Sequence, residues 1–233
     1  MSTVASRPRI RGLLLDAGGV LFGPVGGRWN PRLDFESVVA RFDPALDPAR
    51  DPARFAAGCE AGERFLDASP CTPPRDDYHR AVLAAMGLAD PPASLLEELN
   101  RPLDIPFLEL FPEVIGVLEE IRRRGLPIAV VSNNWKSVGP RRDPLGLDPY
   151  VAVWVISEEL GCDKPDPRMY AAGSTGIGVP PAECLFVDDY PPHVEAAIAL
   201  GYQGVALGRK LPHPPVPVPW IDSLEGVLDY LPG

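Results

Sequence analysis

Two patterns of apolar and polar residues divide this chain into regions. Near its beginning and throughout its second half, short apolar runs stop at a polar residue, as at Arg9–Asp16, Pro127–Val131 and Cys184–Val187. Uninterrupted apolar runs of this kind are typical of strands that are buried on both faces of a parallel sheet. The same pattern predicts strands at Val151–Ile156 and Gly204–Leu207.

Helical patterns separate these predicted strands. Apolar residues three or four positions apart predict helices at Glu113–Arg124, Pro167–Thr175, Pro192–Leu200 and Ser223–Tyr230. Gly125 follows the first of them, at a position where glycine commonly ends a helix. Strands that alternate with helices predict an α/β fold, in which helices cover both faces of a parallel sheet.

Between Leu21 and Phe107 only the helical pattern is present. The predicted helices there are Phe35–Phe42, Ala53–Leu66, Asp76–Met86 and Ala93–Leu99. Asp-Pro and Pro-Pro pairs separate these helices. We therefore expect residues 1–21 and 108–233 to form the α/β core, and residues 22–107 to form a helical domain inserted into it.

Composition and charge exclude several classes of partner. A chain of 233 residues with 45% hydrophobic residues is large enough for such a core and an insert. A net charge of −10 argues against binding to nucleic acid or to an anionic membrane. Met1–Arg11 lacks the apolar segment of a secretion signal, and no apolar run is long enough to span a membrane. We expect a cytoplasmic protein, and the sequence predicts no particular oligomeric state.

Polar residues follow three of the predicted strands. In open α/β sheets ligands bind outside the carboxyl ends of the strands, so these residues are expected to meet in one crevice. They offer carboxylates, a hydroxyl, amides and an ammonium group, and they are Asp16, Ser132, Asn133, Asp188, Asp189 and, from a loop, Lys164. Such a set suits a divalent cation and an anion, most economically Mg²⁺ and a phosphoryl group.

All of these residues except Asp16, which would be costly at the end of a buried strand without a partner, also have an ordinary structural explanation when taken singly. Asp188 and Asp189 precede a predicted helix and suit its N-cap. Ser132-Asn133-Asn134 suits a turn from a strand into a helix. A lone lysine such as Lys164 is most often solvent-exposed. A shared site is favoured by the order along the chain of the four segments that contain Asp16, Ser132-Asn133, Lys164 and Asp188-Asp189.

The ordered segments resemble the motifs of the haloacid dehalogenase-like (HAD) hydrolase superfamily. Asp16-Ala17-Gly18-Gly19-Val20 is similar to its first motif, Ser132-Asn133 to its second, Lys164-Pro165 to its third and Asp188-Asp189 to its acidic fourth. The helical insert between the first two motifs resembles members that carry a helical C1 cap. The resemblance implies a Rossmann-like, doubly wound, three-layer core and phosphoryl transfer through an aspartyl-phosphate intermediate.

The resemblance also implies roles for individual residues. Asp16 is implied as the nucleophile, and the Mg²⁺ ligands as Asp16, the backbone carbonyl of Gly18, Asp188 and Asp189. Ser132, Asn133 and Lys164 are implied to bind phosphate, and Lys164 also to neutralise charge on Asp16. We therefore expect a Mg²⁺-dependent phosphatase acting on a small phosphorylated metabolite. A cap over such a site would open at the connections near Phe22–Gly27 and Arg101–Pro106.

The first motif departs from the family pattern at one position. Gly18 replaces the second aspartate, which in the family protonates the leaving alcohol and later activates water. General acid–base assistance is worth about 10²–10⁴-fold, so its loss is large. Three interpretations follow: a phosphatase that uses a good leaving group or an acid from the cap, a dehalogenase, or a binding or regulatory protein without turnover. A halide leaves without a proton, but the family's dehalogenases need no metal, and Asp188-Asp189 argues for one.

Several further residues are candidates for the missing acid or for substrate contacts. The acid candidates are Glu60, Glu63, His79 and His193, each of which is also explained as a solvated charge or a capping histidine. Glu60 and Glu63 lie in the segment Cys59–Glu63, whose Gly62-Glu63 resembles a substrate-specificity loop in the cap of related members. The candidates for substrate contact are Trp29, Phe35, Arg41 and Trp135, although aromatic residues in such a domain are more often core.

Overall fold

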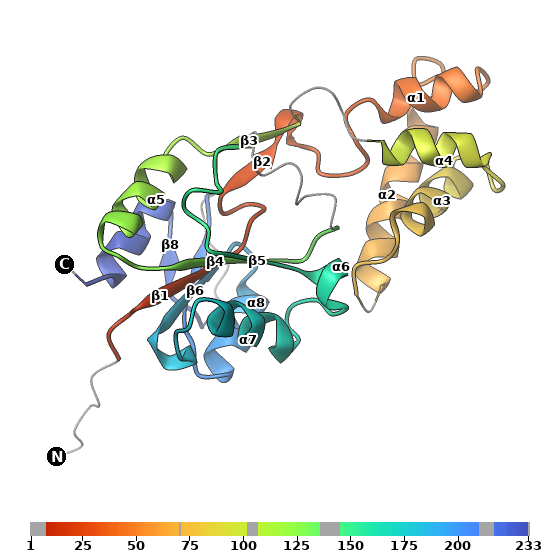
Figure 1. Ribbon diagram of the computed structural model, residues 1–233. Helices are drawn as coiled ribbons and strands as arrows, with labels where there is room; N and C mark the ends of the chain where they lie inside the picture. Colours follow the sequence, from red (N-terminus) through yellow and green to blue (C-terminus); the bar gives the residue numbers. More distant parts are fainter. Residues whose placement is uncertain (1–7, 70, 102–106, 136–144, 210–216, 233) are drawn as a thin grey trace. The chain divides into compact units, whose positions relative to one another are not determined.

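The computed structural model describes residues 8–69, 71–101, 107–135, 145–209 and 217–232. Their contacts divide the chain into two units, one of Met1–Gly23 with Leu110–Gly233 and one of Pro24–Glu109 (Figure 1). Each observed boundary lies two residues beyond the expected one, after residue 23 instead of 21 and after residue 109 instead of 107. Within the expected connection Arg101–Pro106, residues 102–106 lie outside the described part of the chain.

A parallel sheet forms the centre of the first unit. Within the described residues this sheet has six strands, in the order β5-β4-β1-β6-β7-β8. Strand β1 (Gly12–Leu15) lies between β4 (Ile128–Ser132) and β6 (Cys184–Asp188) and pairs in parallel with both. The outer strands are β5 (Val153–Ile156), β7 (Gln203–Leu207) and β8 (Trp220–Ile221). The chain starts in the middle of the sheet and adds strands first on one side and then on the other, so the strand order reverses at β1.

Helices flank this sheet, as the alternating pattern predicts. Figure 1 shows α5 (Val114–Arg123) on one side of it and α7 (Pro167–Gly176) and α8 (Pro191–Ala199) on the other. Leu14 of β1 and Phe186 of β6 are fully buried in one cluster with Met169 of α7. The shorter elements are α6 (Ser157–Leu160) and two 3₁₀ helices, η4 (Pro181–Glu183) and η5 (Leu224–Tyr230). The predicted α/β fold with a parallel sheet is therefore confirmed.

The second unit is helical. It contains α1 (Phe35–Phe42), α2 (Pro52–Ala68), α3 (Arg75–Ala85) and α4 (Ala93–Asn100), together with a short 3₁₀ helix, η1 (Val25–Gly27). Helices α2 and α3 pack closely because Gly58 and Gly62 on α2 carry no side chain. A Cβ atom at Gly62 would lie 2.7 Å from Val82 Cγ2, and one at Gly58 would lie 2.7 Å from Met86 Cγ. None of the helices in the described ranges combines the length and apolar composition that crossing a bilayer requires.

Local sequence signals set several helix ends. The carboxylates of Asp51 and Asp166 accept hydrogen bonds from the backbone amides of Arg54 and Arg168, and a proline follows each cap directly. These two Asp-Pro pairs therefore begin helices, whereas Asp43-Pro44 and Asp47-Pro48 lie between α1 and α2 and begin none. Gly125, with a φ of +71°, follows α5 in the left-handed conformation that favours glycine.

Several short elements differ from the sequence-based expectation. Strand β2 (Phe22–Pro24) pairs with β3 (Leu108–Leu110), although we predicted no strand between Leu21 and Phe107. Strand β2 consists of Phe-Gly-Pro, which has little strand propensity, so a distant partner rather than its own sequence defines it. The predicted last helix is a 3₁₀ helix, and α6 and β8 were not predicted because they are short.

Candidate active site

The strand order brings three polar strand ends together. Strand β1 is the common neighbour of β4 and β6, and all three run in the same direction. Asp16 follows the last residue of β1, whereas Ser132 and Asp188 are the last residues of β4 and β6. All three side chains therefore lie at the carboxyl edge of the sheet, where its strand order reverses.

A buried lysine joins two of these strand ends. Lys164 Nζ lies 2.6 Å from Asp16 Oδ1 and 2.7 Å from Asp188 Oδ2. Lys164 is 4% exposed and Asp188 is 1% exposed. The lysine is therefore not the solvent-exposed residue that its sequence context alone suggests. Charges at this depth are stable only when they are paired, and Lys164 is paired twice.

Asn133 holds the loop that carries this lysine. Its side-chain Oδ1 accepts a hydrogen bond of 2.7 Å from the backbone amide of Lys164, and its Nδ2 donates one of 3.1 Å to the carbonyl of the same residue. Sequence reasoning assigned Asn133 to phosphate binding and missed this contact. Each polar atom of its side chain makes one hydrogen bond to the backbone of Lys164, so the side chain positions the lysine whether or not it also contacts a ligand.

Three carboxylates gather beside the lysine. One oxygen from each of Asp16, Asp188 and Asp189 lies within 4.8 Å of the others. Gly19 makes room for the third, because a Cβ atom there would lie 2.0 Å from Asp189 Oδ2. Gly19 also has a φ of +76°, which favours glycine for a second reason. Three carboxylates carry a charge of −3 when ionised, and Lys164 reduces it to −2.

This crowding alters the acidity of Asp16. Burial raises its pKa to about 6, although Lys164 acts in the opposite direction, and the charge of Asp188 raises it further. For Lys164, burial alone lowers the pKa, but Asp16 and Asp188 outweigh it and the pKa stays above its usual value. The lysine is therefore charged at neutral pH, and the cluster favours an additional cation.

Asp188 and Asp189 occupy different environments. Burial raises the pKa of Asp188, but Lys164 and a hydrogen bond with His193 lower it more, leaving the pKa below its usual value. The distance between His193 Nδ1 and Asp188 Oδ2 is 3.2 Å. Partial burial of the carboxyl group and the charges of Asp16 and Asp188 raise the pKa of Asp189 to about 7. Binding of a divalent cation would favour the ionised form of each carboxylate.

The explanation of Asp188 and Asp189 as a helix cap is wrong. The N-cap residue of α8 is Tyr190, and no side chain caps this helix. Asp188 instead accepts a hydrogen bond of 2.8 Å from the backbone amide of Tyr190, which orients its carboxylate at the end of β6.

The loop after Asp16 is a tight turn. The carbonyl of Ala17 accepts hydrogen bonds from the amides of Leu21 and Phe22, and the amide of Gly19 donates to the carbonyl of Phe22. Gly18 is therefore part of an ordered turn, which fixes the direction of its own carbonyl. Ser132, the other implied phosphate ligand, is 2% exposed at the end of β4.

Three of the four acid candidates lie in the helical unit. Glu60 and Glu63 are part of helix α2, within the helix predicted at Ala53–Leu66, so the expected resemblance of Gly62-Glu63 to a loop is wrong. Glu60 is exposed and lies 3.7 Å from Arg64 in an ion pair. His79 is 1% exposed on α3, and burial lowers its pKa to about 4. A histidine that is buried and neutral at pH 7 suits a structural role better than proton transfer.

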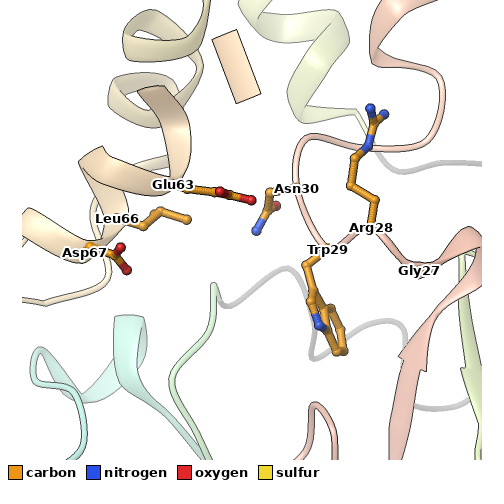
Figure 2. Close-up of a pocket in the computed structure, with 7 residues that line it drawn as sticks. All are labelled: Gly27, Arg28, Trp29, Asn30, Glu63, Leu66 and Asp67. Atoms are coloured by element: carbon orange, nitrogen blue, oxygen red, sulfur yellow. The ribbon is translucent and has the colours of Figure 1, made fainter. Parts of the chain in front are cut away.

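Glu63 lines a pocket within the helical unit. Figure 2 shows Glu63, Leu66 and Asp67 on α2 opposite Arg28, Trp29 and Asn30, and Gly27 completes the lining. The pocket has a volume of about 350 Å³. Arg28 forms a bidentate ion pair with Glu36, so its charge is largely compensated. The pocket combines two carboxylates, an amide and an indole ring.

The candidates for substrate contact separate into different environments. Phe35 is fully buried and packs against Phe55 with a ring distance of 6.4 Å, so it belongs to the core of the helical unit. Trp29 is 45% exposed and lines the pocket. Arg41 is paired with Glu98, and Trp135 is 8% exposed beyond β4.

One residue beside the turn escaped the sequence analysis. Arg209 donates hydrogen bonds to the carbonyls of Gly19 and Val20. It follows the end of β7 by two residues. The polar residue after an apolar run that identifies Asp16 and Asp188 is therefore present here as well, but Gly208 separates it from the strand.

The sheet and the buried charges at its strand ends place the chain among Rossmann-like α/β proteins. A model of the haloacid dehalogenase-like hydrolases matches residues 34–201. Because this match covers more than half of the sequence, the chain belongs to this family of hydrolases. The matched region contains Ser132, Lys164, Asp188 and Asp189 and begins after Asp16.

Individual relatives agree with this assignment. Phosphatase MT3486 of Mycobacterium tuberculosis is 35% identical over 135 residues, which cover 57% of this chain and 62% of that protein. The chain spans less than two thirds of the length of the curated relatives it matches. An L-2-haloacid dehalogenase from Xanthobacter autotrophicus has a TM-score of 0.63 at 19% identity and covers 94% of this chain and 96% of its own.

A HAD phosphatase from Thermococcus onnurineus has a similar fold. Its TM-score is 0.59 at 18% identity, with 94% of this chain and 97% of that chain covered. Since a dehalogenase and a phosphatase are nearly equally similar in structure, the fold alone does not separate the two activities.

Proposed function

We propose that this protein is a Mg²⁺-dependent phosphatase that hydrolyses a small phosphorylated metabolite through an aspartyl-phosphate intermediate. The observation that carries the proposal is the buried cluster in which Lys164 lies within 2.7 Å of both Asp16 and Asp188. A phosphoryl group needs positive charge beside it and a metal ion needs negative charge, and both signs of charge are present at one edge of the sheet.

The carboxylate set supports a hard divalent cation. Three carboxylate oxygens within 4.8 Å of one another are suitable ligands for Mg²⁺. In the proposal Asp16, Asp188, Asp189 and the backbone carbonyl of Gly18 hold the ion. When bound, it withdraws charge from the phosphoryl oxygens. The remaining net charge of −2 in the cluster matches the charge of the ion.

The protein's own residues account for the other requirements. In the proposal a carboxylate oxygen of Asp16 attacks phosphorus, the bond to the leaving oxygen breaks, and water then hydrolyses the acyl phosphate. Lys164 neutralises charge on Asp16 and on the phosphoryl group. Ser132 and the backbone amide of Asn133 donate hydrogen bonds to the phosphoryl oxygens. Asn133 fixes the lysine with its side chain.

The glycine at position 18 predicts that the rate of hydrolysis depends on the leaving group of the substrate. A glycine cannot protonate the leaving oxygen, so an alkoxide leaves slowly, whereas a phenolate leaves without assistance. We therefore propose that the rate depends steeply on the pKa of the leaving group. We also propose that the helical unit acts as a cap that selects the substrate. Relatives named as phosphatases, including hexitol phosphatase A of Escherichia coli, support hydrolysis of phosphate esters over dehalogenation.

Hydrolysis of a graded series of esters tests the proposal. Aryl phosphates of decreasing leaving-group pKa and a set of sugar and polyol phosphates are incubated with Mg²⁺ or with EDTA. Asp16→Asn is the matched control, because it keeps the size of the side chain and removes the nucleophile. We expect turnover that requires Mg²⁺, increases with leaving-group quality and falls by at least about 10³-fold in the variant.

Other outcomes identify the alternatives. Release of halide from 2-haloacids at a rate that EDTA does not change would show a dehalogenase. Binding of Mg²⁺ and of phosphate esters without release of phosphate would show a binding protein. Equal rates for wild type and Asp16→Asn would show that the nucleophile is another residue.

A further inference from the structure

Arg209 connects four groups next to the turn that follows Asp16. Its Nε donates a hydrogen bond of 3.0 Å to the carbonyl of Gly19, and its Nη2 donates one of 2.8 Å to the carbonyl of Val20. Its Nη1 lies 2.6 Å from Glu113 Oε1. Its guanidinium lies 3.6 Å from the centre of the Phe111 ring. A planar group with several fixed donors is suited to making such contacts at once.

The turn that Arg209 holds is in contact with the carboxylate cluster. Gly19 approaches Asp189 so closely that a Cβ atom would lie 2.0 Å from its carboxylate oxygen. The carbonyl of Gly18 is an implied metal ligand. It lies one peptide unit before the carbonyl of Gly19, which accepts the hydrogen bond from Arg209 Nε. A displacement of this turn would therefore change the positions of both Gly18 and Asp189.

We infer that Arg209 is a positioning residue that fixes the turn Gly18–Val20 and thereby sets the affinity for the divalent cation. The inference rests on the proposed function, because it assumes a metal ion at this cluster. Mg²⁺ requires nearly ideal octahedral geometry, so a small shift of a carbonyl ligand lowers its affinity. Groups that orient metal ligands typically contribute about 10–100-fold to metal affinity.

Arg124 provides a matched control in the same unit. It donates hydrogen bonds from Nη1 to the carbonyls of Leu228 and Pro232 and from Nε to Glu120. Its side chain is 18% exposed, compared with 23% for Arg209. Both arginines thus anchor two backbone carbonyls and a glutamate, but only Arg209 anchors the turn after Asp16. A purely structural role would give both the same effect.

The test measures Mg²⁺ binding directly, by titration calorimetry on the full chain. Arg209→Met keeps an apolar side chain over Phe111 and removes all donors, and Arg124→Met removes the corresponding donors in the control. We expect the dissociation constant for Mg²⁺ to rise about tenfold or more in Arg209→Met. In Arg124→Met it should stay within about twofold of wild type, the usual scatter of a peripheral change. Arg209→Lys, which keeps the charge, should give an intermediate value and is the second variant if Arg209→Met does not fold.

Kinetics give a second readout. At saturating Mg²⁺ the turnover of Arg209→Met should recover toward that of the wild type. At low Mg²⁺ the turnover of this variant should be reduced, while its KM for the ester should change little. Equal Mg²⁺ affinities in wild type, Arg209→Met and Arg209→Lys would overturn the inference while leaving the proposed phosphatase intact. Absence of Mg²⁺ binding in the wild type would overturn the proposed function and this inference together.

Discussion

Two regions of the molecule collect carboxylates, and they differ in how the chain brings them there. At the strand ends, Asp16 and Asp188 are 8% and 1% exposed and are paired with a buried lysine. In the pocket of the helical unit, Glu63 and Asp67 lie on successive turns of one helix and are exposed. Only the first arrangement forces charges out of water, and at the strand ends the pKa values of Asp16 and Asp189 are raised to about 6 and about 7.

The difference shows that acidity alone does not identify a reactive site. Residues of a helix face meet because they are close in sequence, whereas Asp16 and Lys164 meet across 148 positions because the sheet topology requires it. Burial of opposed charges is costly and needs exact pairing. A cluster of this kind therefore carries more functional information than an exposed acidic helix face.

The largest predicted effect is at the buried lysine. Lys164→Met leaves Asp16 and Asp188 facing each other without a counter-charge. We expect the free energy of unfolding at pH 7 to fall by about 3–5 kcal/mol, as when one partner of a buried pair is removed, and turnover to be lost. Urea unfolding monitored by circular dichroism measures the difference. The control is Arg168→Met, which breaks the exposed ion pair with Asp166 and should leave stability close to wild type.

The sign of the pH dependence sharpens this prediction. In Lys164→Met the carboxylates have raised pKa values in the folded state, so the variant should regain stability as the pH falls and they become protonated. If Lys164→Met loses no more stability than Arg168→Met, the energetic distinction between the buried cluster and an exposed ion pair is contradicted.

The next effect concerns catalysis at the strand ends. Gly18→Asp introduces a carboxylate at the position where the resemblance to the family implies the general acid and base. We expect the hydrolysis of alkyl phosphates to increase by about 10²-fold, the lower limit of such assistance, with a smaller increase for activated aryl phosphates. Initial rates of phosphate release measure both. Gly18→Asn is the control, since it has the same shape but transfers no proton; an equal gain in both variants would exclude proton transfer as the cause.

The next effect is smaller and lies in the helical unit, where a buried histidine makes the stability fall, not rise, as the pH decreases. His79 is 1% exposed, and burial lowers its pKa to about 4, below its ordinary value. The unfolded chain therefore binds a proton near pH 6.5 that the folded chain does not, and stability is lost as the pH falls through this range. Between pH 7 and pH 5 we expect about 2 kcal/mol of stability to depend on His79. His79→Leu should show a smaller loss over this interval in urea unfolding, and an unchanged pH dependence would contradict burial as the cause.

The smallest predicted effect is in the pocket of the helical unit. If this unit selects the substrate, Glu63→Gln should change the ratio of kcat/KM between two esters by about two- to tenfold, the value of one ordinary hydrogen bond. Mg²⁺ affinity should not change. Glu60→Gln is the control, because Glu60 is on the same helix but outside the pocket lining. Identical effects of both variants would indicate a general charge effect.

Much of the architecture could be predicted because it depends on local patterns. Helix α1 spans Phe35–Phe42, as its apolar spacing predicts, and the buried strands β4 and β6 differ from their predicted bounds by one residue at most. Strand β2 could not be predicted, since Phe-Gly-Pro becomes a strand only through pairing with β3. Local sequence contains no information about a partner so far along the chain.

The candidate site was likewise predictable only in part. The strand-end rule correctly brings Asp16, Asp188 and Asp189 together. It does not show that the Asn133 side chain holds Lys164. That contact depends on the path of the loop that carries Lys164, which spacing along the sequence does not determine.

The central position of β1 also has a consequence for how the chain folds as it is synthesised. Its buried leucines, Leu13 to Leu15, emerge early, but the strands that cover them, β4 and β6, begin only at Ile128 and Cys184. At about 5–20 residues per second, about 8–34 seconds pass between the synthesis of Leu15 and that of Cys184. During that time an apolar strand has no partner, so nascent chains that end before Cys184 should depend on chaperones or aggregate. Asp16 therefore reaches its final surroundings only after strand β6 has been made.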